Sequence, residues 1–214
     1  MMRSLRLPSV YPILDSAAIA ARGVACIDAA EALIDGGAGI LQYRHKGFWN
    51  HAIFDEANAI AQKCAAAGIA FIVNDRGDYA AILRSGLHVG QDDLSPDDAR
   101  RVIGSDSPLG FSTHNASQMM GAQSQPIDYV AFGPVFHTAS KENPDLTTGL
   151  LGLREARGLT ALPLVAIGGI TLENAPGCWE AGADSVAIIS GLLPEPFSLP
   201  AMVGRMREWR RLRT

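Results

Sequence analysis

The chain has 214 residues, of which 48% are hydrophobic and 19% are charged, and its formal net charge is −4. This length and apolar content support one large domain with a well-buried core. The acidic balance argues against nucleic acid or an anionic membrane as the main partner, and no apolar run approaches the roughly 20 residues of a membrane span. Any anionic ligand must therefore be held by a few local cations.

Strand-like and helix-like segments alternate along the chain. Apolar, β-branched runs with polar exits are typical of buried parallel strands, and alanine-rich segments with helical periodicity are typical of helices. Predicted strands cover residues 10–14, 40–43, 69–73, 86–89, 109–112, 127–132, 164–167 and 185–189. Predicted helices cover residues 17–36, 51–67, a short stretch after residue 76, a segment capped by Ser95, and residues 115–123, 150–159, 172–181 and 199–212.

Eight strand-helix units in 214 residues predict a (β/α)₈ TIM barrel near the lower size limit of that α/β fold. We expect residues 1–214 to form a single TIM-barrel catalytic domain. An open doubly wound sheet is the alternative, without its dinucleotide-binding form, because no GxGxxG follows the first strand. In both folds the chemistry lies beyond the carboxyl ends of the strands.

Asp75 and Asp93 follow the third and fourth predicted strands. Neighbouring parallel strands end at the same edge of a sheet, so both side chains can face one cavity. Two adjacent carboxylates repel unless a cation lies between them, and hard oxygen ligands favour Mg²⁺. The spacing fits two solvated loop aspartates equally well. We expect Asp78 on the next helix, and Asp92 could point away from the cavity.

Gln42, Arg44 and Lys46 end the second strand at a spacing of two, so in an extended segment they leave on one face. Two cations and an amide there suit a diphosphate. A solvated strand exit is the alternative for an isolated motif, but charges pointing into a barrel mouth are hard to explain structurally.

Ser112 and His114 alternate in the same way after the fifth strand. No G-x-S-x-G elbow is present, which favours hydrogen bonding to a ligand over a nucleophile. His88, inside the fourth strand, is expected to be a hydrogen-bonded core histidine rather than a metal ligand.

Residues 133–148 form a long polar loop with hydroxyls beside Lys141, which favours an anion contact over an ordinary surface lysine. Glycines after strands seven and eight, at 168–169 and 191, suit a phosphate, although tight turns alone could require them. A metal pair, a diphosphate site and a second phosphate site indicate a transfer in which diphosphate leaves.

Seven segments of the chain occur together in the order and roughly the spacing of one known family. They read QYRHK, VNDR, GLHVGQDDL, GFSTH, DYVAFGPVFHTASK, LPLVAIGGI and AGADSVAIISG. Over nearly its whole length the chain resembles the thiamine phosphate synthases. The resemblance implies a Mg²⁺-dependent transferase that joins a pyrimidine diphosphate to a thiazole phosphate by a dissociative mechanism.

The resemblance also implies a role for each matching residue. The pyrimidine diphosphate would be held by Gln42, Arg44, Lys46, Asn74 and Lys141, with Ser112 on the pyrimidine. Mg²⁺ would be held by Asp75 and Asp93. The thiazole phosphate would be held by Thr138, Ser140, Gly169, Ile189 and Ser190. Residues with catalytic roles would be Arg44, Lys46, Lys141 and Ser112. The chain departs from the family pattern at His137, which replaces a common proline, and at Ser140, which replaces a threonine but keeps the hydroxyl.

Three other functions are alternatives to the synthase. The related thiazole tautomerase lacks the aspartate pair and carries a catalytic histidine where this chain has Pro134. A non-catalytic thiazole phosphate-binding barrel would keep the pocket without turnover. A sugar-phosphate isomerase would leave the cationic residues and the metal pair without a role.

The cysteines and the N-terminus predict the location. Cys26, Cys64 and Cys178 are far apart and form no CxxC pair, which favours buried thiols over a disulfide or metal site. No signal-peptide core precedes Pro8, so we expect a cytoplasmic protein. We expect small-molecule substrates as partners and a possible homodimer, whose interface could include Trp49, Trp179, Trp209 and the final helix.

Overall fold

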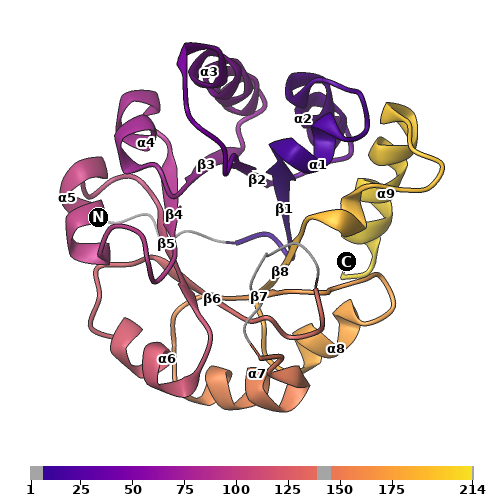
Figure 1. The fold of residues 1–214 in the computed structure, drawn as a ribbon. Coiled ribbons are helices and arrows are strands. Elements are labelled where there is room, and N and C mark those ends of the chain that lie inside the picture. Colours follow the sequence, from indigo (N-terminus) through magenta and orange to yellow (C-terminus); the bar gives the residue numbers. More distant parts are fainter. Residues whose placement is uncertain (1–6, 139–145, 214) are drawn as a thin grey trace.

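Eight parallel strands close into a barrel in a computed structural model that describes residues 7–138 and 146–213. The strands follow one another around the ring in chain order, and the last pairs with the first (Figure 1). They are β1 (Val10–Asp15), β2 (Ile40–Arg44), β3 (Ala70–Asn74), β4 (Gly86–Val89), β5 (Leu109–Thr113), β6 (Tyr129–Phe132), β7 (Leu164–Ile167) and β8 (Ser185–Ile188). The predicted TIM barrel is confirmed, and the open sheet is excluded because no edge is left between β1 and β8.

The helices form an outer ring around the strands (Figure 1). They are α1 (Ser16–Ala20), α2 (Cys26–Asp35), α3 (His51–Ala66), α4 (Gly77–Leu83), α5 (Pro96–Ile103), α6 (Ala116–Ala122), α7 (Gly149–Gly158), α8 (Ala175–Glu180) and α9 (Leu199–Arg211), with a 3₁₀ turn η1 (Ser190–Leu192) after β8. The Ser95 cap is confirmed, because its Oγ accepts a hydrogen bond from the Asp98 N–H at 3.2 Å. No helix within the described ranges has the length and apolarity needed to span a lipid bilayer.

The prediction of one continuous first helix is wrong. Residues 17–36 do not form one helix but are divided between α1 and α2. Gly23 lies between them with a φ of 71°, a left-handed conformation that glycine adopts easily and that ends a right-handed helix. Alanine-rich composition alone hid this break.

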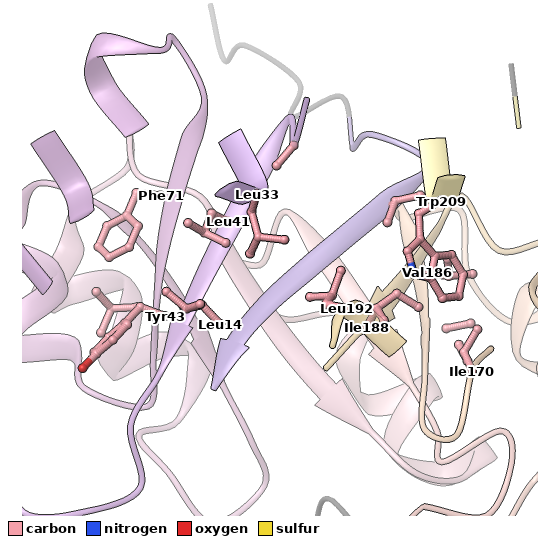
Figure 2. Packing of buried hydrophobic residues seen from close by; sticks show 14 of the residues in the cluster. Leu14, Leu33, Leu41, Tyr43, Phe71, Ile170, Val186, Ile188, Leu192 and Trp209 are labelled. Carbon is pink, nitrogen blue, oxygen red and sulfur yellow. The ribbon is translucent and has the colours of Figure 1, made fainter. Parts of the chain in front are cut away.

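Strand side chains alternate between two apolar layers. One layer fills the barrel interior and includes Tyr11, Ile13, Ile72 and Tyr129. The other lies between the strands and the outer helices, where Figure 2 shows Leu14 and Leu41 from strands close to Leu33 from α2. Every second strand residue points into the barrel. The last inward-pointing residue of each strand therefore lies at the barrel mouth.

Two of the three tryptophans are buried and cannot contribute surface to a dimer interface. Trp209 is fully buried and packs near Val186 and Leu192 (Figure 2). Trp49 is also buried, and its ring stacks on Tyr79 at a centroid distance of 4.6 Å. The suggestion that they supply a dimer interface is therefore wrong, and only Trp179 remains partly exposed.

Candidate active site

A cavity of about 490 Å³ opens beyond the carboxyl ends of the strands and is lined by residues from all eight of them. This size suits one or two small molecules. Every described residue that sequence reasoning placed in the site lines this cavity: Gln42, Arg44, Lys46, Asn74, Asp75, Asp93, Ser112, Thr138, Gly169, Ile189 and Ser190. The two other predicted residues, Ser140 and Lys141, lie outside the described part of the chain.

The two cations at the end of β2 and just after it line the cavity, as their spacing predicts, but each is paired with a carboxylate. Arg44 forms an ion pair with Asp15, and Lys46 Nζ lies 2.5 Å from Asp75 Oδ2. Asp15 is buried at the end of β1 and also caps α1, where its Oδ1 accepts a hydrogen bond from Ala18 N at 3.0 Å. Sequence reasoning missed Asp15 as a site residue, although it has the same inward parity as Ile13.

Asp75 and Asp93 lie close together at the mouth, next to Lys46. Asp75 has a φ of 65°, a left-handed conformation that aspartate tolerates better than most residues. Asp93 Oδ2 accepts a hydrogen bond from the Gly90 N–H at 2.7 Å. Partial shielding from water raises the pKa of Asp93, and the charge and side-chain hydrogen bond of Asp75 add to this, against the opposing effect of Gly90. The two carboxylates are therefore close enough to affect each other through charge and a hydrogen bond.

The donor set fits a divalent hard cation. Among the described residues that line the cavity, the two cations Arg44 and Lys46 face three carboxylates, Asp75, Asp92 and Asp93. No described part of the chain gathers three or more His, Cys, Asp or Glu side chains into a preformed metal cage. Mg²⁺ typically takes one or two protein carboxylates and completes its shell with water and phosphate oxygens, which matches this pair.

The other two aspartates near the pair differ in their position. Asp78 lies on α4, as expected, where it forms an ion pair with Arg76 at 2.6 Å. Asp92 lines the cavity, so the idea that it points away is wrong.

Asn74 brings an unused donor to the cavity wall. Its side chain is buried at the end of β3, and its Nδ2 has no hydrogen-bond partner among the described residues. An unpaired buried N–H group costs roughly 1–3 kcal/mol. An anionic oxygen in the cavity would satisfy it.

His88 is hydrogen-bonded through both ring nitrogens, as expected of a core histidine. Nδ1 lies 3.0 Å from the Tyr129 hydroxyl, and Nε2 lies 2.8 Å from Ser112 Oγ. Burial lowers the pKa of His88 to about 4, so the ring is neutral at pH 7. The ring also borders the cavity beside Tyr11 and Tyr129. Sequence reasoning missed both tyrosines, and the available signal was a hydroxyl-bearing aromatic at an inward strand position, where it needs a polar partner.

The glycines after β7 have a packing role that the sequence left open. Gly168 and Gly169 have φ values of 99° and 62°. A Cβ on Gly169 would lie 2.2 Å from the His137 carbonyl oxygen, and one on Gly168 would lie 2.5 Å from Pro134 Cβ. The loop after β6 therefore packs directly on these glycines. This contact explains them with or without a phosphate.

Comparisons with known proteins point to one family. A family model described as thiamine monophosphate synthase matches residues 10–192. The chain is 43% identical over 199 residues to a thiamine-phosphate synthase of Koribacter versatilis, covering 92% of this chain and 94% of the relative. It is 38% identical over 189 residues to one of Persephonella marina, covering 87% and 88%. A solved thiamine phosphate pyrophosphorylase from Pyrococcus furiosus superposes with a TM-score of 0.80 at 25% identity, covering 95% of both chains.

Proposed function

Because the chain belongs to the thiamine monophosphate synthase family and is a transferase of thiamine biosynthesis, we propose which reaction it catalyses and which part of its pocket binds each substrate. The 4-amino-2-methylpyrimidin-5-ylmethyl group would pass from its diphosphate to 4-methyl-5-(2-phosphoethyl)thiazole, or to the carboxylated tautomer of that thiazole. Thiamine phosphate and diphosphate would be the products. The observation that carries the proposal is the close pair Asp75 and Asp93 beside Lys46 and Arg44 at one cavity mouth.

The diphosphate would lie on the side of the cavity formed by β2 and β3. Arg44, Lys46 and the unpaired Nδ2 of Asn74 would donate to its oxygens, with Lys141 from the loop after β6. Lys46 is held by Asp75 in the free protein, so it would have to be shared with the incoming anion. Mg²⁺ would be held by Asp75 and Asp93 and would supply positive charge beside the diphosphate oxygens.

The reaction would break the bond between the pyrimidine methylene carbon and the diphosphate oxygen, with both electrons leaving on the diphosphate. Arg44, Lys46 and Lys141 would stabilise the developing negative charge. The electron-rich aminopyrimidine would share the positive charge left on the methylene, and Ser112 would hold this ring. The thiazole nitrogen lone pair would then form the new bond. No enzyme nucleophile is needed, because the residues act through positioning and electrostatics.

The thiazole phosphate would lie on the opposite side. Thr138 and Ser140 would donate from the loop after β6, and the backbone of Gly169, Ile189 and Ser190 would approach from the ends of β7 and β8. Backbone N–H groups at such loops are a common phosphate site in barrels.

The thiazole tautomerase is the second candidate, because it needs the same thiazole phosphate site. That activity needs a base at the position of Pro134, and proline offers none. The aspartate pair and Arg44 would also have no role in it.

A coupled assay of diphosphate release tests the proposal. Release should require the pyrimidine diphosphate, the thiazole phosphate and Mg²⁺ together, and chelation should abolish it. Asp75→Asn tests the charge of Asp75 specifically, because asparagine tolerates the same left-handed backbone conformation but carries no charge. A change in thiazole absorbance without the pyrimidine substrate would instead support the tautomerase, and tight binding without diphosphate release would support a non-catalytic barrel.

The proposal extends to the setting of the enzyme. Residues 1–214 would act as one catalytic domain, and the three buried free thiols fit a reducing cytoplasm. A homodimer would use exposed apolar side chains such as Ile82, Leu94 and Val102 around α4 and α5. Analytical ultracentrifugation of the wild type and of Ile82→Glu would test that interface.

A further inference from the structure

A chain of hydrogen bonds crosses the deep end of the cavity from β2 to β5. Gln42 Nε2 donates to the Tyr11 hydroxyl at 3.1 Å, and the Tyr11 and Tyr129 hydroxyls are 2.8 Å apart. The Tyr129 hydroxyl lies 3.0 Å from His88 Nδ1, and His88 Nε2 lies 2.8 Å from Ser112 Oγ. We call these five residues the floor chain. The roles assigned above use only its two ends.

The floor chain is held rigidly by its surroundings. Gln42, Tyr11, Tyr129 and His88 are all buried, and the rings of His88 and Tyr129 stack at a centroid distance of 5.5 Å. Gly110 on β5 leaves the space that they need, because a Cβ there would lie 2.1 Å from Tyr129 Cζ and 2.5 Å from His88 Nδ1. Its polar atoms therefore have little freedom to exchange partners.

The hydrogens of the floor chain can be assigned in one direction. The Gln42 nitrogen can only donate, so Tyr11 accepts from it and gives its own hydrogen to Tyr129. Tyr129 then donates to His88 Nδ1, so the proton of the neutral ring is on Nε2, which donates to Ser112. The reverse order would leave the buried Tyr11 hydrogen unused, since Gln42 and Tyr129 are its only hydrogen-bond partners among the described residues. Such a buried loss is costly.

We propose that Tyr11, Tyr129 and His88 are positioning residues that keep the Ser112 hydroxyl hydrogen directed into the cavity, as a donor to a ring nitrogen of the aminopyrimidine. This inference rests on the proposed function, because it assumes that the pyrimidine lies against Ser112. The hydroxyl already accepts the His88 Nε2–H, so its own hydrogen is the one left for a ligand. The three residues act through Ser112 and set the orientation of the ring.

The neutrality of the floor chain has a chemical reason. Positive charge develops on the pyrimidine methylene when diphosphate leaves, and a nearby imidazolium or a protonated ring would oppose it. Burial lowers the pKa of His88 to about 4, so the ring stays uncharged at working pH. A serine hydroxyl held by neutral groups can orient a ring nitrogen without protonating it.

Nitrogen NMR of the free protein tests the hydrogen assignment directly. With ¹⁵N-labelled histidine, the spectrum should show His88 as the Nε2–H tautomer between about pH 6 and 8. The chain has five histidines, so His88→Gln identifies the signal. An Nδ1–H tautomer, or an equal mixture, would overturn the proposal. Because no substrate is added, this result is independent of whether the proposed reaction occurs.

Kinetics of a matched pair of variants test the positioning role. Tyr129→Phe removes the donor to His88 Nδ1 and should lower kcat/KM for the pyrimidine diphosphate about tenfold, with KM for the thiazole phosphate unchanged and the His88 tautomer mixed. Tyr43→Phe removes another buried hydroxyl, which donates to Glu56 at 2.6 Å outside the barrel interior, and should leave both readouts unchanged.

Unchanged kinetics and an unchanged tautomer in Tyr129→Phe would overturn the positioning role. If the wild type released no diphosphate with both substrates and Mg²⁺, the proposed function would fail while the tautomer assignment still stood on its own measurement.

Discussion

The two ends of the cavity differ in charge, although β1 and β2 contribute residues to both. The floor chain is neutral and, except for the half-buried Ser112 at its end, buried, and its members are joined by their own hydrogen bonds. The mouth carries the group that we call the charged rim, made up of Asp15, Arg44, Lys46, Asp75 and Asp93. On β2 only one residue separates floor from rim, since Gln42 belongs to the first and Arg44 to the second.

This difference shows at which end of the cavity the protein has charged groups that a ligand can pair with. A buried unpaired charge is costly, so the deep positions carry hydroxyls, an amide and a neutral imidazole. At the rim, water and ligand can reach Arg44, Lys46, Asp75 and Asp93 through the cavity, and with the buried Asp15 the rim carboxylates outnumber the cations. The floor keeps a single hydrogen, that of the Ser112 hydroxyl, for a ligand, whereas the rim has the charge pattern of a site that awaits a cation and an anion together.

Removing one rim carboxylate is expected to have the largest effect. Asp93→Ala should lower Mg²⁺-dependent diphosphate release by about 10³-fold, since one carboxylate of the pair is lost. The fold should survive because the side chain opens to the cavity. Asp97→Ala, an exposed aspartate on α5, is the control and should keep full activity. Circular dichroism checks the fold, and full activity in Asp93→Ala would remove the metal assignment.

Lowering the pH should destabilise the protein through His88 of the floor chain. Its pKa is lowered to about 4 in the folded protein, against about 6.5 for a free histidine. The unfolded chain therefore binds the proton first, so stability is fully present above about pH 6.5 and falls as the pH drops toward 4. The loss should reach roughly 3 kcal/mol.

Urea unfolding of the wild type and of His88→Gln measures this loss. The wild type should lose more free energy of unfolding between pH 7 and pH 4 than the variant, because only the wild type gains the proton at this site. Equal pH dependence in both proteins would show that His88 is not held neutral.

Removing the carboxylate that pairs with Arg44 should have an intermediate effect on activity. Asp15→Asn keeps the oxygen that caps α1 but loses the charge that pairs with Arg44. We expect kcat/KM for the pyrimidine diphosphate to fall about tenfold, with little change in melting temperature. Asp15→Ala removes the cap as well and should cost about 1 kcal/mol more in stability. An unchanged kcat/KM in Asp15→Asn would show that Arg44 does not depend on its partner.

Salt should give the smallest effect and should act on the rim alone. Raising NaCl from 50 to 500 mM should increase KM for the pyrimidine diphosphate a few fold, because the distance over which exposed charges interact falls from about 14 Å to about 4 Å. The His88 tautomer seen by NMR should not change, since its contacts are short and buried. A shift in that tautomer with salt would mean that floor and rim are not separate.

The site residues that could be predicted are those marked by position within a strand. The spacing of Gln42, Arg44 and Lys46 placed all three at the cavity, and the strand exits placed Asp75 and Asp93 together. The partners of these residues could not be predicted. Asp15 reaches Arg44 only across the β1 and β2 pairing, and nothing in the local sequence marks that contact.

The order of the strands, and the inward or outward parity along each of them, were determined by the sequence alone, because backbone periodicity and burial of apolar side chains act over a few residues. The break between α1 and α2 was not. Closure of the barrel decided which side chains meet. Tyr11 and Tyr129 are 118 residues apart and share a hydrogen bond, and Trp209 reaches the core only because α9 packs back on α2 and the η1 turn. Such contacts depend on the whole ring of strands, since no local segment brings these side chains together.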